Sequence, residues 1–270
     1  MYEKYWSLQR KPFENTPDPL FLYHSPKHEE ALMRMFYAVK ARKGAAILTG
    51  EYGTGKTTIT RSLVETLRKE SGFEVVLIAN PTLNVNEFLT EILHQLQVQE
   101  IPKKKIELLR KLESILHTNL SNGRHTVIII DEAQSIKRKE TLEELRMLLN
   151  FQLNDQFLLT LILAGQPEIK EKLNQIKQFK QRLSIRYNLK LLDEQETKEY
   201  IEYRLRVAGR TGPIFSDRSL QLIHTYSKGA PRDINNICDL SLLLGSFKKK
   251  IEVDQEVTQE VIQDMIKEFE

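Results

Sequence analysis

One short stretch constrains the fold of this chain more than any other. Residues 44–58 read GAAILTGEYGTGKTT, an apolar run followed by a glycine-rich turn that ends in a lysine and two threonines. A short apolar run bounded by glycines is typical of a buried parallel strand, and the apolar spacing that resumes after Thr57, through Leu63 and Leu67, is typical of a helix. The sequence therefore predicts a strand, a loop and a helix in direct succession.

The loop in this stretch matches the pattern GxxxxGK[ST]. Its glycines let backbone N–H groups turn inward around phosphate oxygens, and the helix N-terminus adds a partial positive charge. The lysine would reach the β- and γ-phosphates, and the hydroxyl residue after it would bind Mg²⁺. A plain glycine turn requires neither residue type at these offsets. We therefore expect ATP to bind at Gly50, Glu51, Tyr52, Gly53, Thr54, Gly55, Lys56, Thr57 and Thr58, with Thr57 also a ligand of Mg²⁺.

Composition and charge exclude several other classes of protein. The 270 residues, 40% of them hydrophobic, can fill the cores of one large and one smaller domain. The formal charge of +3 is too small to indicate nucleic acid or an acidic membrane by itself. The single cysteine, Cys238, excludes a disulfide framework and indicates a buried, reduced thiol. No apolar run approaches the ~20 residues that span a bilayer, and no signal peptide is present, so we expect a cytoplasmic protein.

The rest of the chain divides into an alternating part and a helical part. β-branched or apolar runs at 73–80, 126–134, 157–167 and 185–192 alternate with helical patterns, as in a parallel sheet covered on both faces. From Asp193 the strands cease, and amphipathic segments follow at 193–208, 216–228, 232–247 and 255–269. We therefore predict a doubly wound α/β domain over residues 1–192 and a small helical domain over residues 193–270.

A pair of carboxylates follows one of the apolar runs. Asp131 and Glu132 come directly after Val127–Ile130. In an open parallel α/β sheet, the carboxyl ends of the strands face the crevice in which ligands bind. A lone pair of this kind is often only the polar start of a loop, but its combination with the GxxxxGK[ST] loop favours catalysis. We expect Asp131 to hold Mg²⁺ or its water, and Glu132 to act as the general base for the water that attacks the γ-phosphate.

The order of these motifs resembles that of the AAA+ ATPases, and the resemblance covers nearly the whole chain. The phosphate-binding loop and the strand ending in DE are followed by LILAGQ, QRLSIRY and GAPRDINNI. The N-terminal KPFENTPDPLFLYHSPKHEEAL and the later AGQPEI look like the ExeA-type (general secretion pathway A) branch of this superfamily. The resemblance implies a P-loop AAA+ core, a helical lid domain over residues 193–270, and hydrolysis of ATP with Mg²⁺.

The resemblance also gives roles to four residues outside the loop. Gln166 matches sensor 1, a strand-end polar group that orients the attacking water or contacts the γ-phosphate; an ordinary strand-end amide is the alternative. Arg182 matches the arginine that ends the helix before the last strand and reaches a neighbouring subunit's ATP as an arginine finger, with Arg186 as the alternative. Arg232, just inside a helix that Pro231 opens, matches sensor 2, which points from the lid to the phosphates.

The segment before the loop, residues 1–43, is rich in rigid and apolar residues. By resemblance it crosses the base side of the nucleotide, where flat apolar walls are needed. A plain hydrophobic core is an equally good interpretation of such a cluster. The residues in question are Pro12, Phe13, Pro17, Pro19, Phe21, Leu22 and Tyr23.

The work that hydrolysis drives is open between two functions. In both, the chain assembles with copies of itself into a ring or filament, so that the arginine finger completes a neighbour's site. The ExeA-type resemblance implies a protein partner in an envelope system for secretion, pilus or polysaccharide assembly. Relatives of this kind often continue into a transmembrane segment and a peptidoglycan-binding domain, neither of which is present up to Glu270. A partner could then supply the anchor, or the chain could be a fragment.

The alternative function is a DNA-associated regulator of the transposition type. Residues 170–186 read KEKLNQIKQFKQRLSIR and carry a local excess of basic side chains that could follow a phosphate backbone. A solvated helix face is the competing interpretation. A third possibility, a nucleotide switch with little turnover, is disfavoured by Glu132 and Gln166.

Overall fold

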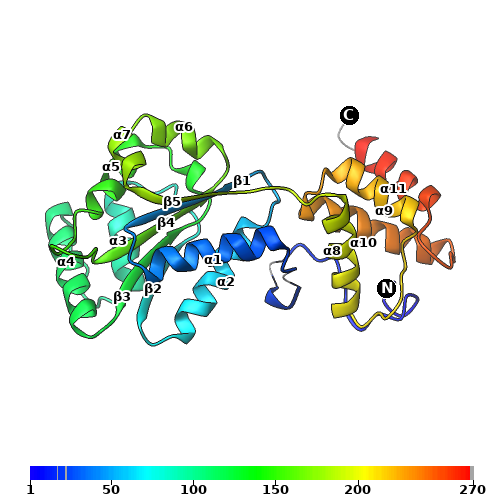
Figure 1. Cartoon of the computed structure of the whole chain (residues 1–270), viewed down its shortest axis with the longest axis horizontal. Helices are drawn as coiled ribbons and strands as arrows, with labels where there is room; N and C mark the ends of the chain where they lie inside the picture. The colour runs from blue at the N-terminus through cyan, green and yellow to red at the C-terminus, as the bar shows by residue number, and fades with distance from the viewer. Residues whose placement is uncertain (17, 22, 268–270) are drawn as a thin grey trace. The chain divides into compact units, whose positions relative to one another are not determined.

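A five-stranded parallel sheet organises residues 28–51 and 59–189 of the computed structural model, which describes residues 1–16, 18–21 and 23–267 (Figure 1). The strand order is β2-β3-β4-β1-β5, and every neighbouring pair is parallel. The predicted runs all form strands, although the last begins earlier than the sequence pattern indicates. The strands are β1 (Ala45–Gly50), β2 (Phe73–Ile78), β3 (His125–Ile130), β4 (Leu159–Gly165) and β5 (Leu183–Leu189).

Helices cover both faces of this sheet, and a separate hydrophobic core lies on each face. On β3, Val127 and Ile129 pack in the core that includes α1 and α2, whereas Ile128 and Ile130 pack in the core of the opposite face. Figure 1 shows α1 and α2 on one side of the sheet and α6 and α7 on the other. The predicted doubly wound architecture is therefore confirmed. The helices are α1 (Pro26–Lys40), α2 (Lys56–Lys69), α3 (Val85–Gln95), α4 (Lys105–Ser121), α5 (Lys139–Leu148), α6 (Glu168–Asn174) and α7 (Lys177–Arg182), with the 3-10 turn η2 (Ala133–Ser135) after β3.

A second compact unit consists of residues 1–27, 52–58 and 190–270, described up to Lys267. The change from strand to helix at Asp193 has a local cause, because its side chain accepts the backbone N–H of Glu196 while the Glu196 side chain accepts that of Asp193. This capping box satisfies two N–H groups that a helix start leaves without partners. All four predicted amphipathic segments form helices: α8 (Glu194–Val207), α9 (Asp217–Ser227), α10 (Pro231–Phe247) and α11 (Gln255–Lys267).

The N-terminal residues pack into this helical unit rather than with the sheet. Phe13 and Phe21 are buried in its core, and the Trp6 indole N–H donates to the carbonyl of Leu242 at 2.8 Å. The Arg204 side chain, which is only 5% exposed, stacks over the Phe21 ring. Aromatic side chains far apart in sequence thus build one core, and the division differs from the boundary at residue 192. Pro17 and Leu22 lie outside the described residues, as do residues 268–270 of the predicted last helix.

Two further expectations concern the thiol and the membrane. Cys238 is a free, fully buried cysteine on α10, and burial raises the pKa of its thiol well above the ordinary value. Over the described residues, no helix combines the length and the apolar character needed to cross a membrane.

Candidate functional site

The candidate site lies along the carboxyl edge of the parallel sheet. Because β3, β4 and β1 are consecutive in the strand order, the residues that follow them leave the sheet side by side. These residues are Asp131 after β3, Gln166 after β4 and Glu51 after β1. Ligands of open α/β sheets bind outside this edge. The fold thus brings together three stretches of chain that the sequence analysis selected separately.

The phosphate-binding loop connects β1 to α2, as predicted. Gly53 and Gly55 have φ angles of +77° and +96°, a region that side chains with a Cβ rarely adopt. Lys56 is the first residue of α2 and is 5% exposed, so this lysine is buried at a helix N-terminus. Backbone N–H groups at such a terminus attract phosphate.

The side chain of Asp131 lies at the start of α2. Asp131 is 4% exposed, and its carboxylate accepts a long hydrogen bond from the Thr60 hydroxyl at 3.5 Å. Thr57 and Thr60 are three residues apart in one helix and therefore share a face. Hydroxyl and carboxylate oxygens are both ligand types that Mg²⁺ accepts.

Glu132 is held in an unusual backbone conformation. Its φ of +50° lies in the left-handed region, which a glutamate rarely adopts. The Asp131 carboxylate accepts the Glu132 backbone N–H at 3.0 Å, and the Glu132 carbonyl accepts the Ser135 N–H at 2.8 Å. The neighbouring residues therefore stabilise a sharp turn at Glu132.

Sequence reasoning missed Gln134, which links two of the predicted residues. Its side-chain N–H donates to the Glu132 carboxylate at 2.5 Å, and its side-chain oxygen accepts the backbone N–H of Gln166 at 2.9 Å. The Lys172 ammonium donates to the carbonyl of Gln134 as well. Position alone could have drawn attention to Gln134, which lies two residues after Glu132. Its reach to β4 required the strand order.

The two candidate arginine fingers have partners within their own chain. Arg182 ends α7 immediately before β5, as the resemblance implied, and its guanidinium donates to the carbonyl of Leu149 at 3.1 Å and the side chain of Asn150 at 3.0 Å. Arg186 is more exposed and donates to the carbonyls of Leu183 at 3.3 Å and Lys180 at 2.5 Å. Arg182 thus also serves the C-terminus of α5.

Arg232 of the helical unit lies over the phosphate-binding loop. Its guanidinium carbon is 4.9 Å from the centre of the Tyr52 ring, and it donates a hydrogen bond to the Tyr52 hydroxyl. A Cβ on Gly53 would lie 3.4 Å from the Cβ of Arg232. The predicted sensor 2 arginine, one residue inside α10, is therefore adjacent to the loop that would bind phosphates.

The donors fit a magnesium ion that is shared with a substrate. The described residues contain no group of three or more His, Cys, Asp or Glu side chains that could hold a metal by themselves. Mg²⁺ at nucleotide sites is usually held by one or two carboxylates together with substrate phosphates. The buried Asp131 carboxylate is a ligand of this type.

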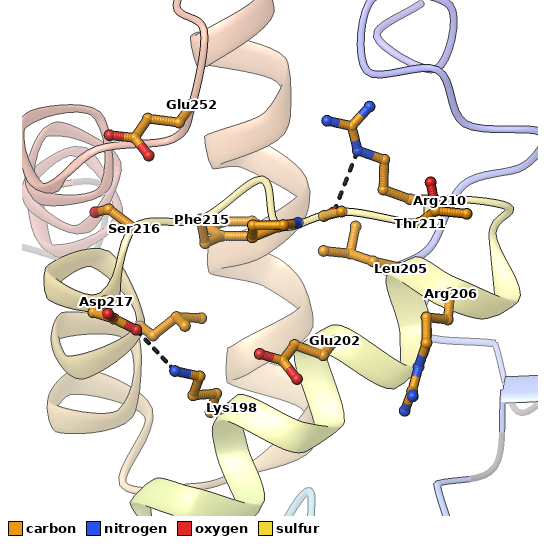
Figure 2. A pocket seen from close by; sticks show the side chains of 13 residues that line it. Lys198, Glu202, Leu205, Arg206, Arg210, Thr211, Phe215, Ser216, Asp217 and Glu252 are labelled. Carbon is orange, nitrogen blue, oxygen red and sulfur yellow. Dashed lines mark hydrogen bonds and ion pairs between the residues drawn. The ribbon is translucent and has the colours of Figure 1, made fainter.

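Two hollows elsewhere differ in charge. A cavity of about 320 Å³ beside β5 is lined by three cations, Lys170, Lys180 and Arg186, and by no carboxylate. A larger hollow of about 640 Å³ lies in the helical unit, where Figure 2 shows side chains of both signs. In that hollow the Lys198 ammonium pairs with Asp217 at 2.8 Å. Only the first hollow has one sign of charge.

Comparisons with known proteins show the family and the fold of this chain. The family model described as "AAA domain" matches residues 39–173. The chain is 39% identical over 246 residues to General secretion pathway protein A of Aeromonas hydrophila, covering 90% of this chain and 44% of that protein. The chain spans about half the length of the curated relatives it matches.

Similar solved structures show the same fold at low sequence identity. Cdc6p of Pyrobaculum aerophilum matches with a TM-score of 0.72 and 15% identity, over 94% of this chain and 70% of that one. The ORC2 protein of Aeropyrum pernix, solved as ADPNP–ADP complexes, matches with a TM-score of 0.69 and 17% identity, over 94% and 71% of the two chains.

Proposed function

Because the chain belongs to the AAA domain family and is an ExeA-type AAA+ ATPase, we propose that it hydrolyses ATP with Mg²⁺ as an oligomer and thereby remodels or assembles a partner complex. The observation that carries the proposal is the carboxyl edge of the sheet, where the phosphate-binding loop, Asp131 and Gln166 follow three consecutive strands. In a site of this kind the protein contributes positioning and electrostatic stabilisation.

Each residue has a defined task in the proposed reaction. The backbone of Gly50–Thr58 and the Lys56 ammonium would bind the phosphates, and Thr57 and Asp131 would hold Mg²⁺, which would neutralise phosphate charge. Glu132 takes a proton from the water that attacks the γ-phosphorus. The bond from that phosphorus to the β–γ bridging oxygen breaks, leaving ADP and inorganic phosphate. Gln166 orients the water, and Arg232 contacts the phosphates.

We place Arg182 at the ATP of a neighbouring subunit, with Arg186 as the alternative. A guanidinium there stabilises charge that develops in the transition state and contributes little to ATP affinity in its own subunit. Arg182 would have to leave the carbonyl of Leu149 and the amide of Asn150, both at the C-terminus of α5. Assembly is therefore coupled to a rearrangement at that helix end.

Mixing two inactive variants tests the shared site. Arg182→Ala should bind ATP normally and hydrolyse it about 10³-fold more slowly, within the range for arginine fingers. Lys56→Ala should lose nucleotide binding but retain its finger. Activity should partly return when the two are mixed, because some interfaces then contain both functional parts. If light scattering shows co-assembly and activity stays at the sum of the two, Arg182 does not act in trans.

For the partner, we favour a protein of an envelope secretion, pilus or polysaccharide system. The support is the similarity to General secretion pathway protein A, together with the N-terminal and AGQPEI motifs. ATP hydrolysis would move the helical lid and so do mechanical work on that partner. We place this work in the cytoplasm.

The hollow beside β5 is the observation that favours a second function, as a DNA-associated regulator. The basic segment 170–186 forms α6, α7 and β5 rather than one helix, and this folding gathers Lys170, Lys180 and Arg186 around one cavity. Across the described residues, none of these three forms a salt bridge. Cations in such a groove could contact successive phosphates.

Duplex DNA separates the two functions. An envelope ATPase should be indifferent to DNA, whereas a regulator should bind it with a steep salt dependence. Fluorescence anisotropy with labelled duplex, at low and moderate salt and with ATP, measures this directly. Saturable binding that is weakened by combined Lys170→Gln and Lys180→Gln, but not by Lys177→Gln, would favour the regulator. Lys177 is an exposed lysine of α7 that does not line the cavity.

A further inference from the structure

We propose that Gln134 is a positioning residue for ATP hydrolysis, whose side-chain amide fixes the Glu132 carboxylate and ties it to the end of β4. The inference rests on the proposed role of Glu132 as general base. It concerns a residue that contacts the base and the backbone of the β4 end, without itself contacting the reacting atoms.

The Gln134 amide uses both of its ends. The N–H donates to one oxygen of the Glu132 carboxylate at 2.5 Å, and the amide oxygen accepts the backbone N–H of Gln166 at 2.9 Å. A hydrogen bond with an ionised partner is about twice as strong as one between neutral groups. Gln134 therefore connects the ends of β3 and β4 through the carboxylate that would receive the proton.

The hydrogen bond occupies only one of the two carboxylate oxygens of Glu132. The other oxygen can still accept a proton from water, so the bond orients the base without consuming its function. A general base must lie within hydrogen-bond reach of the proton that it removes, and a misplacement of about 1 Å can reduce the rate about a hundredfold. Fixing the Glu132 carboxylate before the reaction reduces this loss of rate.

Close packing limits the alternatives open to the Gln134 side chain. A Cβ on Gly165 would lie 2.7 Å from the Gln134 side-chain oxygen and 3.2 Å from its backbone nitrogen. Glycine at the end of β4 thus leaves the space that the amide occupies. On the other side, the Lys172 ammonium of α6 donates to the carbonyls of Gln134 and Ile136, the latter at 2.8 Å. Lys172 therefore fixes the turn that carries the amide.

The same contacts connect α6 to the base. Gln166 directly precedes Pro167, and α6 begins at Glu168. A displacement of α6 would pull on the Gln134 backbone through Lys172 and on its side chain through the N–H of Gln166. Gln134 thus links α6 to Glu132 through hydrogen bonds.

Steady-state kinetics on variants of the full chain test the positioning role. Gln134→Met keeps the side-chain length and loses both hydrogen bonds, and it should lower kcat by between about tenfold and about a hundredfold. The KM for ATP should stay within about twofold, because phosphate binding is untouched. Gln134→Glu keeps an acceptor for the N–H of Gln166 but places a carboxylate against that of Glu132, and it should be no more active than Gln134→Met. Ser135→Ala, on the same turn, should keep the parental kcat.

A double-mutant cycle separates positioning from a general structural effect. If Gln134 acts through Glu132, adding Gln134→Met to Glu132→Gln should lower single-turnover hydrolysis by less than about twofold. A loss of the full tenfold or more in that background would overturn the proposal, and so would a parental kcat for Gln134→Met or Gln134→Glu. If Glu132→Gln itself keeps the parental rate, the assignment of the base fails, which is a separate result.

Gly165→Ala provides a second test of the positioning role and leaves the Gln134 residue itself unchanged. The added methyl group displaces the amide, so kcat should fall in the same direction as in Gln134→Met, again with a small change in KM. Circular dichroism would show whether each variant is folded. A folded Gly165→Ala protein with parental kcat would contradict the proposed fit between Gly165 and the Gln134 amide.

Discussion

The sheet edge and the helical unit hold their candidate site residues in different ways. Asp131 is 4% exposed, and Glu132 is fixed by hydrogen bonds from its own turn and from Gln134. Arg232 is exposed, and the contacts that hold it come from Tyr52, which is itself 59% exposed. Fixed polar groups stabilise a transition state without reorganising, whereas a long exposed arginine keeps about 2 kcal/mol of rotamer entropy. We infer that the edge performs the chemistry and that Arg232 adjusts to the nucleotide.

The largest effect should come from the edge. Glu132→Gln keeps the shape of the side chain but removes its basicity, so kcat should fall about 10³-fold, within the range for general bases. ATP affinity by calorimetry should stay the same, because the phosphates are bound elsewhere. The matched control is Glu168→Gln, which changes an exposed carboxylate at the start of α6. This variant should hydrolyse ATP normally. Parental turnover in Glu132→Gln would leave the edge without a base.

A pH effect on stability should come from His125 in the sheet unit. Burial, and secondarily the charge of Arg42, lowers the pKa of His125 from 6.5 to about 4. The unfolded chain takes up a proton near pH 6.5 and the folded chain only near pH 4, so between these values the unfolded state binds more protons. Stability is therefore present above pH 6.5 and is lost as pH falls toward 4. From pH 7 to pH 5 the loss should be about 2 kcal/mol.

Two probes distinguish the units in this measurement. Trp6 is the single tryptophan and is buried in the helical unit, so its fluorescence reports that unit, whereas far-ultraviolet circular dichroism reports both. In urea unfolding followed by circular dichroism, the free energy of unfolding should be lower at pH 5 than at pH 7. The unfolding transition followed by Trp6 fluorescence should not show this decrease. His125→Gln should reduce the difference between pH 7 and pH 5. If His125→Gln shows the same difference in stability between pH 7 and pH 5 as the parental protein, other groups cause that difference.

Local patterns predicted the elements of the fold well, because strands and helices follow from apolar spacing. The segments at 216–228 and 232–247 became α9 and α10 within a residue of the expected bounds. Placement of the N-terminal residues could not be predicted, because Phe13 and Phe21 pack against helices almost two hundred residues later in the chain. Their choice of core depends on tertiary packing, which a local pattern does not contain.

The position of the candidate site in the fold was predictable where one motif supplied both residue type and spacing, whereas the roles of its residues stay predictions. The loop at 50–58 and the pair Asp131 and Glu132 are of this kind. Gln134 was missed because its role depends on β3 and β4 being neighbours, and the contact of Arg232 with Tyr52 was missed because 180 residues separate them. Family resemblance placed Arg182 at the end of a helix correctly, but it could not show that Leu149 and Asn150 bind its guanidinium.

A smaller effect is expected in the helical unit. Arg232→Ala removes one charge-assisted contact with phosphate, worth about 1.5 kcal/mol, so ATP affinity should fall about tenfold. Arg232→Lys should recover only part of this loss, because an ammonium lacks the planar fork of a guanidinium. The control Arg218→Ala changes an exposed arginine of α9 and should bind ATP as the parental protein does. Calorimetry on the three variants decides whether the position or the charge matters; equal losses in all three would leave Arg232 without a special role.

The smallest effect should come from Tyr52, which supports Arg232. Tyr52→Phe keeps the ring under the guanidinium and loses the hydroxyl, and ATP affinity should fall about twofold, as for an exposed hydrogen bond. Tyr52→Ala also loses the exposed cation–π contact, and the loss should reach about fivefold.

The dependence of these losses on Arg232 is the sharper measurement. If Tyr52 acts only by orienting the arginine, Tyr52→Ala should have no further effect on ATP affinity in the Arg232→Ala protein, because the group that it orients is absent. If the loss persists in full, Tyr52 contacts the nucleotide itself. The phosphate-binding loop would then carry its own specificity, and the contrast between a fixed sheet edge and an adjustable arginine would have to include a third, independent contact.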